Sequence, residues 1–427
     1  MREPSRVLHV ITGLGVGGAE QQLRLLLRSM PVAADVVTLT HPGAVADGIR
    51  ADGVRVRHLG MRGNRDLTAL PRLARLIRDG NYDLVHTHLY RACLYGRLAA
   101  RLAGVRNVVA TEHSLGDAAI EGRPLTAGTR GLYLATERLG RATVAVSATV
   151  AARLRAWGVA GDRIHVVPNG IDAARFRYEP AARAAARGHL GVPPGTTVVG
   201  GVGRLVPGKR FDRLLRACAP HPDVRLLLVG DGPERGALHR LARELGMADR
   251  VLMPGECPGA AAPATHDGRG STPELPELLA AMDLFVSPSS EEAFGLSVLE
   301  ALAAGLPVLH VTCPAIDDVP GAEAPSAYRV GGGTAQLAAA LRVHLAARHG
   351  RQPVPGAVAR YDIARTAEQL LEVYVRTISG SGPDAPVPAL SAARRPAPLR
   401  PARSPLGGRD SASTRRARGA GTHRRAV

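Results

Sequence analysis

The feature that most constrains the fold is an alternation of short apolar runs with longer amphipathic stretches, and it occurs twice along the chain. Between the runs, leucines or alanines recur at spacings of three and four with arginines on the opposite face, a pattern typical of surface helices. Strands that alternate with helices predict a parallel sheet with helices on both faces. We therefore expect an α/β protein with two tandem doubly wound, Rossmann-like domains.

The expected elements follow from this pattern. The first domain should hold strands at 7–11, 35–40, 54–59, 84–87, 108–111, 143–146 and 165–167, and helices at 21–29, 67–78 and 92–102. The second should hold strands at 197–202, 225–229, 250–253, 284–286 and 307–311, and helices at 211–218, 233–245, 276–281, 296–304 and 333–347. A last helix is expected at 363–378.

These elements divide the chain into a first domain at 1–190 and a second domain at 191–362. A helix at 363–379 and a Pro-, Ser- and Arg-rich tail at 380–427 follow, and the tail's composition predicts disorder. An Ala-, Gly- and Pro-rich loop at 257–273 interrupts the second domain. Since ligands bind at the carboxyl ends of parallel strands, the chemistry should lie in a cleft that the two sheets face.

A glycine loop separates the first strand from the first helix. Gly13-Leu14-Gly15-Val16-Gly17-Gly18 fits G-x-G-x-x-G, but the second strand ends at Thr40-His41 without the acid that a nicotinamide dinucleotide site needs. Two interpretations remain. The loop is either a tight strand–helix turn or a site where glycines and a helix N-terminus bind an anion.

Lys209 is the one lysine among the 55 basic residues of the chain. A compact ammonium can lie deep against a phosphate, whereas a guanidinium is larger and forked. Lys209 and Arg204 follow the first strand of the second domain, so they are candidates for binding a diphosphate. The alternative is a solvated basic loop.

A third motif runs from Ser287 to Val308. Its helix should begin near Gly295 and Leu296, whose N–H groups are then free to bind phosphate oxygens. Glu292 precedes the helix and Glu300 lies within it, and a carboxylate can accept hydrogen bonds from two neighbouring sugar hydroxyls. The alternative is a helix-start carboxylate and a surface acid.

Histidines give weaker signals. His113 follows a strand end and could face the cleft, although a lone histidine is more often structural. His86 and His88 flank another strand end and are not predicted to act. No Asp-x-Asp metal signature occurs, so neither a metal nor another cofactor is expected.

Composition bounds the location. Cys93, Cys218, Cys257 and Cys313 show no metal or disulfide spacing, which favours a reducing compartment, and no apolar run is long enough to span a membrane. Ten arginines against two aspartates give the tail +8 of the net +18. We expect a cytoplasmic protein with no specific nucleic-acid partner. Weak contact of its basic surface and tail with the inner face of an anionic membrane is left open.

In combination, Gly17-Gly18-Ala19-Glu20, Gly203-Arg204-Leu205 with Lys209, Gly230-Asp231-Gly232-Pro233 and the Glu292–Glu300 segment resemble the retaining family 4 glycosyltransferases of GT-B fold, over about residues 6–378. The resemblance implies that 1–190 is the acceptor-side domain, that 191–362 binds the nucleotide sugar and that the helix at 363–379 crosses back to the first domain. It also implies the following roles. Arg204 and Lys209 bind the donor diphosphate and Glu300 its ribose; Glu292, Gly295 and Leu296 hold the transferred sugar; His113 lies near the sugar's 6-position, and Gly17 and Gly18 line the cleft.

The implied activity is retaining transfer of a hexose from a nucleotide-diphosphate sugar to a glycan, lipid-linked or small-molecule acceptor, in cell-envelope or secondary-metabolite synthesis. A sugar-nucleotide epimerase of GT-B fold and a degenerate sugar-nucleotide-binding protein are the alternatives. Three departures bear on this reading. Arg210 stands where the family has glycine, the 257–273 insertion adjoins the expected base loop, and Cys313-Pro314-Ala315-Ile316-Asp317-Asp318 replaces a Gly-Gly loop, which could reduce activity.

Overall fold

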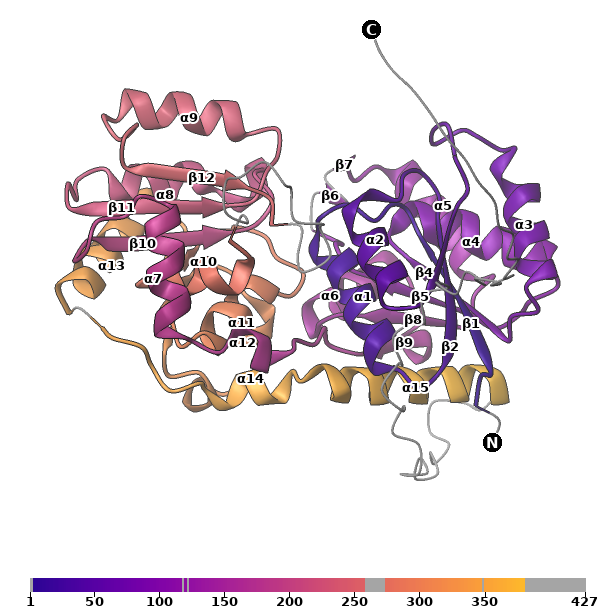
Figure 1. Cartoon of the computed structure of the whole chain (residues 1–427). Coiled ribbons are helices and arrows are strands. Elements are labelled where there is room, and N and C mark those ends of the chain that lie inside the picture. Colours follow the sequence, from indigo (N-terminus) through magenta and orange to yellow (C-terminus); the bar gives the residue numbers. More distant parts are fainter. Residues whose placement is uncertain (1–2, 117–118, 121–122, 258–272, 348, 381–427) are drawn as a thin grey trace, which may run out of the picture. The chain divides into compact units, whose positions relative to one another are not determined.

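The first domain is built on a parallel sheet (Figure 1). The computed structural model describes residues 3–116, 119–120, 123–257, 273–347 and 349–380, which fall within one compact unit, Met1–Ser391. The loop predicted at 257–273, save its end residues, and the predicted tail beyond residue 380 lie outside the described residues.

Within the described residues the first sheet has the strand order β3-β2-β1-β4-β5-β8-β9. These strands are β1 (Arg6–Ile11), β2 (Ala33–Thr38), β3 (Arg55–His58), β4 (Leu84–His88), β5 (Val108–Glu112), β8 (Ala142–Ala145) and β9 (Ile164–Val166). Its helices are α1 (Gly18–Ser29), α2 (Gly43–Ala51), α3 (Ala69–Asp79), α4 (Tyr90–Leu102), α5 (Ala127–Glu137) and α6 (Ala148–Trp157). A short antiparallel pair, β6 (Ala119–Ile120) and β7 (Arg123–Pro124), precedes α5. Every strand predicted here is confirmed, whereas α2, α5 and α6 were missed.

The second sheet is also parallel, in the order β12-β11-β10-β13-β14-β15 among the described residues. Its strands are β10 (Thr197–Val202), β11 (Val224–Val229), β12 (Val251–Gly255), β13 (Leu284–Ser287), β14 (Val308–His310) and β15 (Ala327–Arg329). Its helices are α7 (Pro180–His189), α8 (Phe211–Cys218), α9 (Arg235–Glu244), α10 (Leu275–Ala281), α11 (Leu296–Ala303), α12 (Pro314–Asp317), α13 (Thr334–Ala347) and α14 (Gly356–Arg360). Two doubly wound α/β domains are thereby confirmed. The cleft that they were expected to face stays a prediction.

Arginines tie α7 to the end of α10. Arg183 and Arg187 each donate to the carboxylate of Asp283 at 2.6 Å, and together with Arg351 they donate to the carbonyls of Ala280, Ala281 and Met282. A helix leaves its last carbonyls without partners inside the helix. These guanidiniums supply those partners, so α7 is fastened to the second domain.

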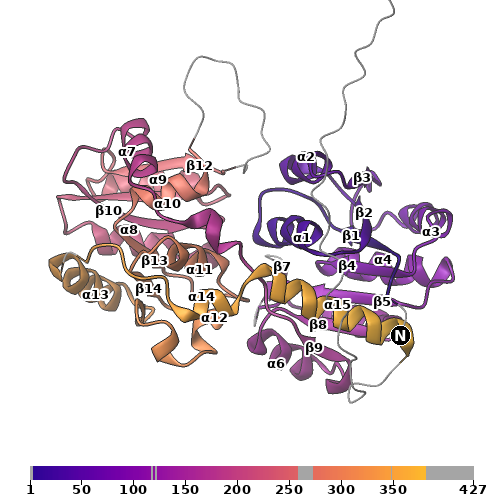
Figure 2. The same ribbon diagram turned by 60° about the horizontal axis from the view of Figure 1, so that its bottom comes forward.

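The last helix, α15 (Ile363–Ser379), returns to the first domain and packs beside α1 and β5 (Figures 1 and 2). The carboxylate of Asp362 caps its start by accepting from the N–H of Ala364 at 2.8 Å. Its apolar face joins the core around β1, β4 and β5, and Tyr374 is fully buried there. The Tyr374 hydroxyl hydrogen-bonds Nδ1 of His86 on β4 at 2.6 Å, so the helix is held by a polar contact as well as by packing.

Candidate functional site

Two strand-end loops of the second domain lie against each other. The N–H of Gly203, after β10, donates to Val229 O at 3.0 Å, and the N–H of Leu205 donates to Asp231 O at 2.9 Å. A Cβ at Gly230, whose φ is +132°, would lie 2.1 Å from Gly203 O, so this close approach requires glycine. Arg204 is exposed to solvent, and its guanidinium makes no hydrogen bond or ion pair with the described residues.

Lys209 and Glu292 are direct partners. The ammonium of Lys209 donates to Oε1 of Glu292, and their side chains are 23% and 13% exposed. The N–H of Ser290 also donates to Gly208 O at 3.3 Å, which holds the two loops together. The structure therefore brings together two residues, 83 positions apart, that the sequence assigned to a diphosphate and to a sugar.

Arg210 has an unusual backbone. Its φ of 54° and ψ of 34° lie in the left-handed region, which a side chain normally disfavours. Its guanidinium donates from Nε and Nη2 to the carboxylate of Asp212 at 3.0 and 2.9 Å. Because Arg210 caps α8 immediately after Lys209, this turn sets the direction in which the lysine leaves the loop.

The start of α11 is shaped by Gly295. Its φ is +106°, and a Cβ there would lie 2.4 Å from Sγ of Cys313. The loop after Val311 supports this turn, because the N–H of Ala315 donates to Phe294 O at 2.9 Å. The residues that replace the expected Gly-Gly loop thus pack directly beneath the turn. At Leu296 the first helical turn leaves N–H groups without intrahelical partners, which suits an anion.

Glu300 lies on α11 and is partly buried. Burial raises the pKa of its carboxyl to about 7, and the positive charge of Arg175 opposes this in part. The group therefore changes charge near neutral pH. It is not the ordinary surface acid that the alternative interpretation described.

The glycine loop of the first domain approaches α11. Gly17 caps α1 in an extended conformation, and a Cβ at Gly18 would lie 3.4 Å from Cδ1 of Leu296. The N–H of Leu14 donates to His41 O at 3.2 Å, which braces the loop. Gly18 and Leu296, both predicted to contact the donor, therefore lie close together.

His113 is buried immediately after β5 and is not alone. Its Nε2 lies 3.1 Å from Nδ1 of His88, and Nε2 of His88 lies 3.0 Å from Nδ1 of His9. Burial lowers the pKa of His113 to about 4. His88 was not predicted to act, and His9 was not among the predicted site residues. The signal was the register of β1 and β4, which pairs His9 with His86 and so places the imidazoles on adjoining strands.

His9, His86 and His88 form the one group in the described part of the chain whose ligand atoms, all within 4.8 Å of one another, could hold a metal ion. Each of these histidines already makes hydrogen bonds. His86 uses both nitrogens, toward the hydroxyl of Tyr374 at 2.6 Å and that of Thr111 at 2.7 Å. A buried divalent ion would also lack a carboxylate among these ligands. Metal-independent action stays a prediction.

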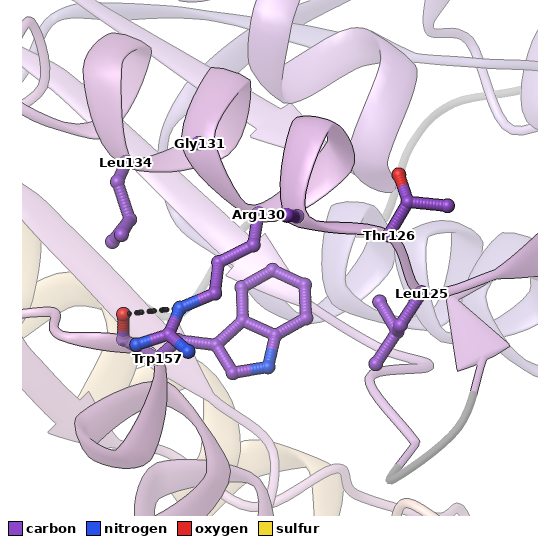
Figure 3. Close-up of a pocket in the computed structure, with 7 residues that line it drawn as sticks. Leu125, Thr126, Arg130, Gly131, Leu134 and Trp157 are labelled. Carbon is purple, nitrogen blue, oxygen red and sulfur yellow. Dashed lines mark hydrogen bonds between the residues drawn. The ribbon is translucent and has the colours of Figure 1, made fainter.

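A pocket of about 530 Å³ lies elsewhere in the first domain, at the start of α5 (Figure 3). Its lining residues are Leu125, Thr126, Ala127, Arg130, Gly131, Leu134 and Trp157. Arg130 crosses it and donates from Nε to Trp157 O at 2.9 Å. None of the predicted site residues lines this pocket, and its cation is already engaged, so we do not assign the donor to it.

Family models match both halves of the chain. Residues 16–175 match the model described as Glycosyltransferase Family 4, and residues 183–331 match that of Glycosyl transferases group 1. Among solved structures, that of Anabaena Alr3699/HepE in complex with UDP-glucose aligns with a TM-score of 0.73. At 22% identity, over 88% of this chain and 99% of that one, it supports the fold alone.

Curated relatives agree with the models. D-inositol 3-phosphate glycosyltransferase of Nocardia farcinica is 35% identical over 69% of this chain, which spans 66% of that relative's length. GDP-mannose-dependent alpha-mannosyltransferase of Mycobacterium tuberculosis is 35% identical over 60% of the chain and 64% of its own length. 2-deoxystreptamine N-acetyl-D-glucosaminyltransferase of Streptomyces fradiae is 30% identical over 86% of the chain and 93% of its own length. From the family models and the near full-length Streptomyces relative, we conclude that this chain belongs to glycosyltransferase family 4.

Proposed function

We propose that the protein transfers a hexose from a nucleotide-diphosphate sugar to an acceptor hydroxyl with retention of anomeric configuration. The observation that carries the proposal is the Lys209–Glu292 pair, held in one site with exposed Arg204 nearby in sequence. In this proposal the donor diphosphate replaces Glu292 as the partner of Lys209. Glu292 is then free to accept hydrogen bonds from sugar hydroxyls.

The leaving diphosphate is where negative charge develops. Arg204 and Lys209 stabilise it as cations, and the N–H groups at Gly295 and Leu296 add the N-terminal end of a helix dipole. The acceptor oxygen forms a bond to the anomeric carbon as the bond from that carbon to the phosphate oxygen breaks. The acceptor proton passes to the leaving phosphate on the same face of the sugar, so no protein base and no metal is required.

The remaining residues orient the donor. Ionised Glu300 accepts hydrogen bonds from the two ribose hydroxyls, and the backbone at Gly17 and Gly18 lies along the phosphates. His113 hydrogen-bonds a hydroxyl of the sugar. Support for these roles comes from the approach of Gly18 to Leu296 and from the position of His113 at the carboxyl end of β5.

The relatives act on different sugars, so the proposal leaves the donor base and sugar to experiment. The acceptor is a glycan, a lipid-linked molecule or a small molecule. Among the described residues no helix is both long and apolar enough to cross a membrane. Peripheral contact of the basic surface with an anionic membrane stays part of the proposal.

A thermal-shift panel of UDP-, GDP- and ADP-sugars tests the function, because a ligand that binds the folded state raises the midpoint of unfolding. We expect one donor class to stabilise the protein and to release nucleotide when an acceptor is added, with the product's anomeric configuration followed by proton NMR. Conversion of the sugar without an acceptor would indicate an epimerase instead. Binding of a donor without transfer or epimerisation would indicate a degenerate binding protein. A product with inverted anomeric configuration would show that the transfer is not retaining.

A further inference from the structure

Three imidazoles form a row that runs from the interior of the first domain to the carboxyl ends of its central strands. His9 lies in β1, His88 ends β4 and His113 follows β5. The two N···N contacts are 3.0 and 3.1 Å long, and neighbouring ring planes are inclined by only 20° and 29°. All three side chains are buried, so these contacts do not compete with solvent.

The row restricts where its protons can be. Each N···N hydrogen bond needs one nitrogen that carries a proton and one that does not. Burial lowers the pKa of His9 to about 3, that of His113 to about 4 and that of His88 well below its usual value, and the neighbouring His86 acts on His88 in the same direction. Each ring is therefore neutral and carries one proton near neutral pH.

Two proton arrangements satisfy both contacts. In one, His9 donates to His88 and His88 donates to His113, so Nδ1 of His113 carries a proton. In the other, both donations run toward His9, so Nδ1 of His113 is an acceptor. A mixed arrangement would place two protons, or none, in one of the contacts. The tautomer of His113 is thus tied to those of His88 and His9.

The open end of the row is Nδ1 of His113. That atom is buried and has no hydrogen-bond partner in the described part of the chain. A buried nitrogen without a partner loses hydration without compensation, and a ligand group could supply the missing bond. Its place after β5, at the carboxyl edge of the sheet, is where ligands bind in doubly wound folds.

We propose that His88 and His9 are positioning residues, which tie the tautomer of His113 to their own and hold its ring so that its Nδ1 hydrogen-bonds one hydroxyl of the bound sugar nucleotide. A hydroxyl both donates and accepts, so it can satisfy either arrangement. The inference rests on the proposed function only in naming the ligand as a sugar nucleotide.

Two substitutions at His88 distinguish a positioning role for this residue from a role in which its side chain only fills space in the core. An Asn amide reproduces the place of Nδ1 and can still bond His113, whereas a Gln amide reaches the place of Nε2 and can bond only His9. We expect His88→Asn to keep the KM for the nucleotide sugar within about threefold, and His88→Gln to raise it about five- to tenfold, as for one lost neutral hydrogen bond. His165→Gln, at a partly buried histidine on β9 outside the row, is the matched control.

UDP-glucose, GDP-mannose and UDP-N-acetylglucosamine serve as the donor probes, and thermal melting confirms that each variant is folded. Equal KM values for His88→Asn and His88→Gln, or a lower value for the Gln variant, would overturn the positioning role. A residue that only fills space would give the Gln variant a KM no higher than that of the Asn variant, because Gln is the larger amide and leaves less of the imidazole's volume unfilled.

Nitrogen NMR of the free, histidine-labelled protein gives a readout that needs no donor. In both arrangements all three rings carry the proton on the same nitrogen, so we expect His9 and His113 to show the same tautomer populations in the wild type and in His165→Gln, and different populations in His88→Gln. Different populations at His9 and His113 in the wild type would overturn the proposal. If none of the donor probes is turned over, the proposed function fails separately, and the tautomer populations alone decide whether the row couples His113 to His9.

Discussion

At the residue scale, Glu300 carries a carboxyl whose charge changes close to neutral pH. Its pKa in the folded protein is about 7, above the ordinary 4.5. The folded state therefore holds this proton more tightly than the unfolded state, so the stabilisation is fully present below about pH 4.5 and is lost as the pH rises through 7. Glu300→Gln should be more stable than the wild type at pH 8, on the order of 2 kcal/mol, and similar to it at pH 4.5.

Urea unfolding at the two pH values measures this difference. Glu368→Gln, on the exposed face of α15, should not alter the pH dependence. Equal stability of Glu300→Gln and the wild type at pH 8 would contradict the raised pKa. The donor bond in the proposal needs the ionised carboxylate, so the affinity of the wild type for its donor should rise above pH 7, and the Gln variant should lose that rise.

At Lys209 the difference between an ammonium and a guanidinium matters for the proposed binding of a diphosphate. Apart from Lys209, every Lys or Arg position of the chain is an arginine. The group paired with Glu292 is nevertheless an ammonium. An ammonium has three freely rotating donors, so it can turn from a carboxylate to a phosphate without moving its stem. A guanidinium would hold the carboxylate in a planar fork and would fill the space that the phosphate needs.

At the scale of elements, α8 begins with a strained residue. Arg210 adopts left-handed backbone angles, which cost an L-residue about 1–2 kcal/mol and cost glycine little. We therefore expect Arg210→Gly to be more stable than Arg210→Ala by about 1 kcal/mol, although glycine normally weakens a helix. Both variants lose the same contact with Asp212, so the comparison isolates the backbone. Chemical unfolding measures it, and an Ala variant as stable as the Gly variant would show that the turn is not strained.

The docking of α15 depends on a buried hydroxyl. Tyr374→Phe removes the partner of His86 Nδ1 and leaves that nitrogen buried and unsatisfied, which should reduce the free energy of unfolding by about 1–3 kcal/mol. Tyr328→Phe, at a tyrosine that is 37% exposed, should change it by less than about 0.5 kcal/mol. Urea titration of the wild type and both variants measures these differences. A Tyr374→Phe variant as stable as Tyr328→Phe would mean that apolar packing alone holds the helix.

Elements were predictable where burial leaves a strong pattern. The central strands are continuous apolar runs, and α8 and α15 show leucine spacing, so their positions follow from the sequence. By contrast, α5 is rich in Ala, Thr and Gly, and α6 is rich in Ala. Their best signals were the capping residues Thr126 and Ser147, whose side chains accept from the N–H groups of Thr129 and Val150. The edge strand β15 (Ala-Tyr-Arg) is half-exposed and is not an apolar run, so it left no pattern.

Contacts within the site were less predictable than its residues. The sequence pointed to Lys209 and Glu292 separately, but their pairing depends on how loops from β10 and β13 meet. Likewise, histidine spacing on one strand says nothing of a row across three strands, since that needs the register of β1, β4 and β5. The roles assigned to Arg204, Gly17, Gly18, Gly295, Leu296 and His113 stay predictions until a donor is bound.

At the scale of the whole molecule, the two domains repeat one architecture with different tasks. In the second, the loop after β10 carries Arg204 and Lys209, and the loop after β13 carries Glu292. In the first, β1, β4 and β5 carry the row that ends at His113. The three residues of the second domain and His113 of the first all follow the carboxyl ends of parallel strands, so one rule of sheet geometry accounts for both sites.

The central claim is that Lys209 serves the donor's diphosphate in a way that arginine cannot. The most direct test is the kcat of Lys209→Arg with the nucleotide sugar that the panel identifies, beside Arg240→Lys on the exposed face of α9 as the reverse exchange. Charge is conserved in both variants, and a displacement of about 1 Å at a reacting group can cost about a hundredfold in rate. We expect kcat to fall at least about tenfold in Lys209→Arg and to be unchanged in Arg240→Lys; a Lys209→Arg enzyme with the kcat of the wild type would contradict the account.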